Sequence, residues 1–115
     1  MGVLAETPQQ ILDQLVRNAG NAASPQRGEQ IFRAKAGQGE VESCMSCHTS
    51  NPKAAGQHVR SRKLIEPLAV VANPERFTDP AKVEKWFKRN CKDVYARSCS
   101  AQEKADFTAY MLSVQ

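Results

Sequence analysis

The sequence predicts an all-α domain of four to five helices. Three dipeptides, Thr7-Pro8, Ser24-Pro25 and Asp79-Pro80, each combine an N-cap residue with a proline suited to the first helical position. A fourth helix start, Ser100 with Glu103 three residues later, has the pattern of a capping box. No run alternates convincingly between apolar and polar residues, so no strand is predicted.

The first two predicted helices form the N-terminal part of the chain. The first carries a four-residue apolar stripe: Ile11, Leu12, Leu15 and Val16. The second contains QRGEQIFRA, which places Gly28 and Phe32 one turn apart on one face. Because a chain of 115 residues suits one domain, we expect a single unit with an N-terminal helical extension (1–22) and a core (24–114).

The last two predicted helices each gather apolar residues on one face. In the helix after Asp79-Pro80, the i, i+3, i+4 and i+7 positions are Val83, Trp86, Phe87 and Asn90. In the helix after Ser100, the residues on one face are Phe107, Tyr110, Met111 and Val114. Asn90 is notable, because a buried amide at the end of an apolar stripe needs partners.

Residues 37–78, between the second and third of these helices, are rich in glycine and proline. A structureless loop of this length is uncommon in a compact domain. We therefore expect a cofactor, rather than regular secondary structure, to organise the region. A short helical turn is expected over SCMSCH (43–48), and LIEPLAV (64–70) is expected to supply wall residues of the cofactor site.

Charge and apolar content argue against some classes of function for this chain. The formal charge is +4, and no basic run is interleaved with aromatic residues, which argues against nucleic acid and weakly for acidic protein partners. No segment is long and apolar enough to predict a membrane span. The first ten residues, MGVLAETPQQ, lack the features of a signal peptide, so we expect an export signal to have been removed.

The motif CMSCH is the strongest chemical signal. Cys44 and Cys47 are separated by two residues, and His48 follows directly. Such a pair can hold zinc, form a redox disulfide or carry a covalent haem. A four-thiolate zinc site would need Cys91 and Cys99, which lie too far apart in sequence for a typical zinc knuckle. A thioredoxin-like disulfide lies between a strand and a helix, and no strand is predicted.

Covalent haem explains the two cysteines and the histidine of the motif. Both cysteine sulfurs add to the vinyl groups of haem, and the adjacent histidine binds iron. Neither alternative requires a histidine directly after the second cysteine. The sequence therefore predicts one haem c on Cys44 and Cys47, with His48 as an axial ligand. Covalent haem, and four cysteines in two close pairs, indicate an oxidising compartment, which in bacteria is the periplasm.

The ligand on the other side of the iron is less obvious. Met1 is terminal, Met45 lies between the attachment cysteines, and Met111 lies deep in the last helix, where a core position is expected. His58 is expected to be an exposed loop histidine. Asn90 either caps the end of its helix or approaches the iron. The residues alone leave these alternatives open.

The second and last predicted helices, with their glycine and aromatic faces, resemble the crossing helix pair of class I cytochromes c. The segment IEPLAV resembles the proline–leucine element of that class. By this resemblance, the carbonyl of Pro67 accepts a hydrogen bond from the outer N–H of His48, and Leu68 presses on the haem ring. In the polar loop that precedes this element, Arg60, Arg62 and Lys63 are candidate contacts for the haem propionates.

A more specific resemblance is to the sphaeroides haem protein (SHP) family of monohaem c-type cytochromes. It covers about residues 26–112 and rests on VEKWFKRNC, the second cysteine Cys99, the following EKADF, and IEPLA. In this family an asparagine side chain occupies the sixth iron position. The resemblance implies that Asn90 is the distal ligand and that Cys91 and Cys99 form a disulfide. It also implies a dihaem cytochrome c as electron donor, often with a membrane cytochrome b upstream.

Ligation by asparagine has a chemical consequence. A neutral amide is a weak donor, so it should leave when reduction lowers the charge of the iron. Ferrous iron with an open position in an apolar pocket of Val83, Trp86 and Phe87 would bind oxygen, nitric oxide or carbon monoxide. The sequence therefore favours a gas-binding and electron-transfer haem protein without enzymatic activity, and it leaves redox turnover of oxygen or nitric oxide open as the alternative. The competing functions are a plain electron carrier, with His58 or Met111 as permanent sixth ligand, and a zinc-stapled binding module.

Overall fold

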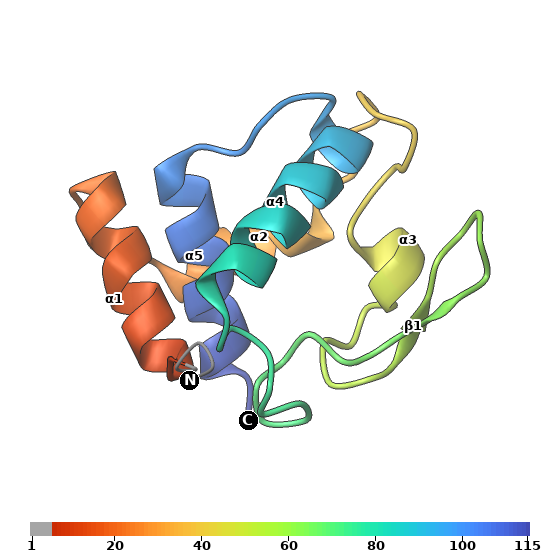
Figure 1. Cartoon of the computed structure of the whole chain (residues 1–115). Helices are drawn as coiled ribbons and strands as arrows, with labels where there is room; N and C mark the ends of the chain where they lie inside the picture. The colour runs from red at the N-terminus through yellow and green to blue at the C-terminus, as the bar shows by residue number, and fades with distance from the viewer. Residues whose placement is uncertain (1–5) are drawn as a thin grey trace.

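Helices dominate the structure, a computed structural model that describes residues 6–115 (Figure 1). The expectations about Met1 and the rest of the first five residues lie outside the described residues. The elements are α1 (Pro8–Ala19), α2 (Pro25–Arg33), α3 (Met45–His48), β1 (Gly56–Gln57), β2 (Leu64–Ile65), α4 (Pro80–Tyr95) and α5 (Ala101–Ser113). The predicted all-α architecture is confirmed.

All four predicted helix starts are confirmed by their caps. The side chain of Thr7 accepts a hydrogen bond from the backbone N–H of Gln10, and the side chain of Ser24 accepts one from Arg27. Asp79 caps two N–H groups at the start of α4, and the predicted capping box at the start of α5 is present. Each cap satisfies backbone donors that a helix start would otherwise leave unpaired.

The prediction that the chain contains no strand is wrong in one place. Residues 56–57 pair antiparallel with residues 64–65 in a two-residue ladder. Two residues are too few to show an alternating pattern, so sequence periodicity could not reveal them. A Cβ atom on Gly56 would overlap the carbonyl of Cys47, so this glycine allows the ladder to lie directly against α3.

The crossing of α2 over α5 is the closest helix contact of the core. A Cβ atom on Gly28 would overlap the backbone carbonyl of Asp106 in α5. One turn further along, the rings of Phe32 and Tyr110 pack with their centroids 5.9 Å apart. Helix α1 lies on the other side of α5 (Figure 1) and buries Ile11. The predicted helix crossing is confirmed.

A buried carboxylate joins these helices, and the sequence did not reveal it. Asp106 is 2% exposed and accepts hydrogen bonds from Ser24 N at 2.8 Å, Arg27 Nε at 2.8 Å and Gln102 Nε2 at 2.9 Å. Burial alone would raise the pKa of Asp106, but these hydrogen bonds outweigh it and lower the pKa below its usual value. The carboxylate therefore ties the start of α2 to the middle of α5.

Helix α4 lies across from α3 and the loop that follows α3 (Figure 1). The segment before α3 is attached to the end of α4, because Gly39 N and Val41 N donate to the carbonyls of Val94 and Asp93 at 3.1 and 2.9 Å. No helix within residues 6–115 is both long and apolar enough to cross a membrane.

We predict that Gly28→Ala destabilises the protein by about 1–3 kcal/mol, because the added methyl group forces α2 away from α5. Alanine is the better helix former, so the sign of the effect separates close packing from helix propensity. Chemical denaturation of the variant measures the loss. The control is Gln30→Ala at an exposed position of α2, and equal stability of the two variants would contradict the close crossing.

We predict that Asp106→Asn flattens the acid end of the stability profile. The folded-state pKa of Asp106 is depressed, so its contribution is fully present above its unfolded pKa of about 3.9 and is lost as the pH falls through the folded pKa. Wild type should lose stability below about pH 4 more steeply than the variant. Denaturation midpoints measured between pH 2 and pH 7 test this, and parallel profiles would rule it out.

Candidate functional site

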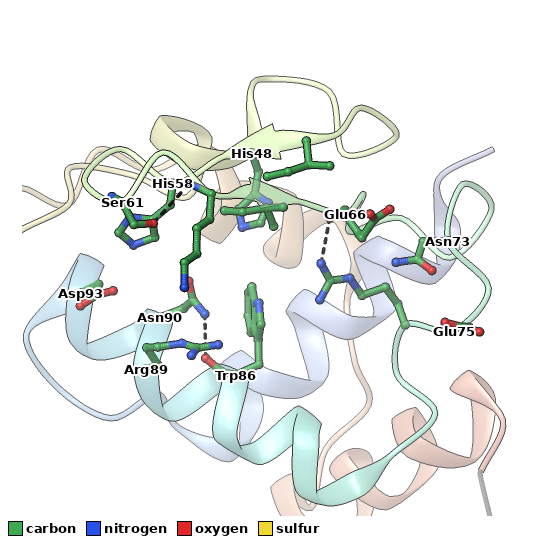
Figure 2. A pocket seen from close by; sticks show the side chains of 14 residues that line it. His48, His58, Ser61, Glu66, Asn73, Glu75, Trp86, Arg89, Asn90 and Asp93 are labelled. Atoms are coloured by element: carbon green, nitrogen blue, oxygen red, sulfur yellow. Dashed lines mark hydrogen bonds between the residues drawn. The ribbon is translucent and has the colours of Figure 1, made fainter.

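A cavity of about 620 Å³ opens between α4 and the segment that runs from α3 past β2 (Figure 2). His48 lines one wall, and Trp86 and Asn90 line the wall that α4 provides. Cys44 and Cys47 border a small recess beside the same three residues. The cavity and this adjoining recess thus bring together the two candidate attachment thiols, the candidate axial histidine and the candidate distal amide.

His48 is set up to be a neutral nitrogen ligand. It ends α3, is 4% exposed, and its Nδ1 atom has no hydrogen-bond partner among residues 6–115. Burial, and secondarily the positive charge of Arg76, lowers the pKa of His48 to about 4. The imidazole is therefore neutral near pH 7, which is the form that binds metal.

The thiols of Cys44 and Cys47 are unbonded and half-buried. Burial raises the pKa of Cys44 to about 11, so this group is held as a thiol rather than a thiolate. In contrast, Cys91 and Cys99 are joined by a disulfide. Because that disulfide occupies the second pair, the four-thiolate zinc site is contradicted. No cluster of three or more possible metal-binding side chains occurs within residues 6–115.

Asn90 lies in the body of α4, not at its end. The helix continues to Tyr95 and is capped by Ala96, so the interpretation of Asn90 as a C-cap is wrong. Its Nδ2 atom donates to the carbonyl of Trp86 at 2.9 Å, one turn earlier. This bond fixes the orientation of the amide, and Oδ1 accepts no hydrogen bond from residues 6–115. Oδ1 is also the better donor atom for a metal, because the amide nitrogen carries no free lone pair.

The remaining predicted wall residues divide between cavity and core. Trp86 lines the cavity, and its ring centroid lies 6.2 Å from that of His48. The ring of Phe87 packs edge-on against Trp86 and Phe107, with centroid distances of 5.3 and 5.8 Å. Phe87 does not line the main cavity and borders only a small recess that Asn90 also lines. Val83 and Leu68 do not line the cavity; both belong to the hydrophobic core. Their role as cofactor contacts stays a prediction, because apolar periodicity does not distinguish a core face from a cavity face.

The two alternative ligands have other partners. His58 lies in a loop, as expected, but it lines the cavity and is half-buried, so the expectation that it is exposed was wrong. Its Nδ1 atom accepts hydrogen bonds from the backbone N–H groups of Arg60 and Ser61 at 3.1 and 3.2 Å. Met111 is fully buried in the core of α5, as expected.

The hydrogen bond expected between His48 and the carbonyl of Pro67 is absent from the structure. Its carbonyl accepts hydrogen bonds from Arg76 Nε at 3.0 Å and Asn73 Nδ2 at 3.3 Å, and not from His48. Arg76 also donates to the carbonyl of Glu66 at 2.8 Å. The sequence did not reveal Arg76, because only the fold brings it from the loop before α4 to this wall.

Of the three cations proposed as propionate contacts, only Lys63 lines the main cavity. Arg60 pairs instead with Glu40 and, at 3.6 Å, with Asp93. Arg62 borders a separate hollow beside Cys47 and Gln57. Arg76 is a better candidate, because it is a half-buried cation that lines the cavity and forms no ion pair within residues 6–115.

These residues fit a covalently attached haem. The two thiols and the orphaned imidazole share one wall, an amide with a free oxygen stands on α4, and cations are available for two acidic side groups. Leu64, Ile65 and Trp86 supply apolar surface along the cavity. Haem would also provide the apolar surface that organises the loop over residues 37–78, which forms little regular structure of its own.

Known proteins share this architecture. A family described as a domain of unknown function (DUF1924) matches residues 18–111. The cytochrome c-type protein SHP of Cereibacter sphaeroides is 41% identical over 107 residues, which cover 91% of this chain and 82% of that protein. The solved structure of oxidised SHP, described as an oxygen-binding cytochrome c, superposes with a TM-score of 0.87 at 40% identity and covers 95% of this chain and 98% of the other.

A second solved relative is cytochrome c'' of Methylophilus methylotrophus. Its solution structure, described in terms of haem-ligand detachment, has a TM-score of 0.78 at 34% identity and covers 93% of each chain. Both relatives are c-type cytochromes that match nearly the whole chain. The chain therefore belongs to the SHP family of c-type cytochromes, and its cofactor is one covalently attached haem c.

Proposed function

We propose that this chain is a periplasmic gas-binding haem protein in which Asn90 is a ligand that leaves upon reduction. Haem supplies an iron that accepts an amide oxygen when ferric and a diatomic gas when ferrous. The observation that carries the proposal is the amide of Asn90, which is held by Trp86 with Oδ1 free at the cavity that His48 lines.

Each residue of the site has a distinct task in this proposal. Cys44 and Cys47 attach the cofactor, and His48 is the permanent axial ligand, kept neutral by burial. Trp86, Phe87 and Phe107 form a contiguous aromatic group with centroids 5.3–5.8 Å apart, which excludes water from the side of Asn90. The Cys91–Cys99 disulfide holds the residue next to Asn90 in place.

The relatives support a leaving ligand and a gas. SHP is described as an oxygen-binding cytochrome c, and the structure of cytochrome c'' is described as giving insights into haem-ligand detachment. Transferred to this chain, these properties favour oxygen, with nitric oxide and carbon monoxide as further ligands. The same resemblance favours a dihaem cytochrome c as electron donor, with a membrane cytochrome b upstream. A formal charge of +4 would assist docking of an acidic donor.

A plain electron carrier has less support. His58 would have to abandon two backbone hydrogen bonds at its Nδ1 atom, or bind through Nε2, which carries the proton while Nδ1 accepts. Met111 would have to leave the core, where its side chain is fully buried. Asn90 requires neither change.

We predict that the protein matured with a haem-attachment system exceeds the mass of its chain by one haem. Cys44→Ala and Cys47→Ala should each retain a single thioether bond, and the double variant should lose the haem under denaturing conditions. Mass spectrometry measures all four proteins. A colourless wild-type product would contradict the attachment.

We predict that Asn90→Ala changes the ferric spectrum to a water-bound or five-coordinate form. The affinity of the ferrous form for carbon monoxide should change by less than about twofold, because a ligand that has already left imposes little penalty on the gas. Absorption and electron paramagnetic resonance spectra, together with carbon monoxide titration, test both parts. Asn90→Met should do the reverse, since a thioether remains on ferrous iron and suppresses gas binding.

His58→Ala is the matched control for the Asn90 variants, because His58 lines the same cavity. Its spectra should match wild type in both oxidation states. A change to high-spin ferric haem in His58→Ala, combined with an unchanged ferric spectrum in Asn90→Ala, would replace this proposal with the plain electron carrier.

A further inference from the structure

The carbonyl of Pro67 has no free lone pair. Arg76 Nε donates to it at 3.0 Å and Asn73 Nδ2 at 3.3 Å. A carbonyl oxygen has two lone pairs, so these two donors occupy both. The same guanidinium also donates to the preceding carbonyl, that of Glu66, at 2.8 Å, which holds Arg76 firmly in this position.

The outer nitrogen of His48 is correspondingly unpartnered. Its Nδ1 atom is buried and has no hydrogen-bond partner among residues 6–115, although buried polar atoms rarely lack one. Arg76 and His48 line the same cavity. Asn73, the other donor to Pro67, lines this cavity as well, and Arg76 is close enough to His48 for its charge to lower the pKa of the imidazole.

We propose that Arg76 and Asn73 are positioning residues that keep the Pro67 carbonyl from accepting the outer N–H of His48, so that the axial imidazole remains a weak donor. This inference rests on the proposed ligation of the iron by His48. A hydrogen bond from the outer N–H of a ligating histidine to a carbonyl raises the basicity of the ligand. Withholding that bond lowers the electron density at the iron and favours its reduced state.

This arrangement suits a protein whose proposed gas binding begins only after reduction. A strongly donating histidine would stabilise ferric iron and the amide ligand with it. Two side chains from the loop before α4 instead occupy the carbonyl of Pro67, so the reduced state is favoured without any change to the ligands themselves.

Three single variants separate this role from simple stapling of the loop. Asn73→Leu removes one donor without changing the charge, and Arg76→Leu removes the other donor together with a charge. Arg89→Leu is the matched control, because Arg89 is an arginine of α4 that lines the same cavity and donates to no carbonyl within residues 6–115. Resonance Raman spectra of the ferrous protein measure the stretching frequency between iron and His48, and redox titration measures the reduction potential.

We expect the iron–histidine frequency to rise and the potential to fall in Asn73→Leu, because a lone pair of Pro67 becomes available to His48. Arg76→Leu should shift both further in the same direction. Arg89→Leu should lower the potential only by its charge and leave the frequency unchanged. If Arg76→Leu does not fold, Asn73→Leu still tests the inference, because it also removes a donor to the carbonyl of Pro67.

The inference would be overturned if Asn73→Leu had the same iron–His48 frequency and reduction potential as wild type. It would also be overturned if the iron–His48 frequency of wild type already lay in the range of strongly hydrogen-bonded histidines. A six-coordinate ferrous protein would contradict the proposed departure of Asn90, yet the potentials of the same variants would still decide the role of Arg76 and Asn73. A His48→Ala variant with an unchanged ferrous spectrum would remove the premise and the inference together.

Discussion

The close crossing of α2 and α5 supports everything else in the molecule. It is possible because Gly28 has no side chain to separate the helix from the carbonyl of Asp106. The same carboxylate residue ties the start of α2 to α5 through Ser24 and Arg27. With α5 held from this side, the ring of its Phe107 packs against Trp86 and Phe87 of α4, and this contact supports Trp86, which lines the haem cavity. Distortion at the crossing would therefore reach the cofactor through three side chains.

The features that the sequence predicted correctly are local. Helix starts depend on a capping side chain and its next three residues, so Thr7, Ser24, Asp79 and Ser100 could be found by inspection. The CMSCH motif is equally local, because two thiols and a histidine must be adjacent to reach one cofactor. Helical spacing drew attention to Asn90, but only the family resemblance implied its role as a ligand, which stays a prediction, and the pairing of Cys91 with Cys99, which the structure contains.

The features that the sequence missed depend on contacts between distant segments. Asp106 is one charged residue among many in the sequence, and only its burial between α2 and α5 distinguishes it. Leu68 and Val83 have the right apolar character for a cavity wall, but the fold turns them into the core. Arg76 and Pro67 are nine positions apart in a loop without periodicity, so their hydrogen bond could not be inferred before the fold was known.

The hydrogen bond from Asn90 to Trp86 also bears on how fast the proposed site can open. Helix α4 is fixed behind Asn90 by the Cys91–Cys99 disulfide and by the backbone bonds from residues 39 and 41, so the helix itself has little freedom to move. Departure of the amide then requires only rotation of one side chain about its own bonds, and not a collective shift of the helix, which would take microseconds to milliseconds. For the proposed ligation, the amide would be an intramolecular competitor that remains within reach of the iron and recaptures it at once upon oxidation.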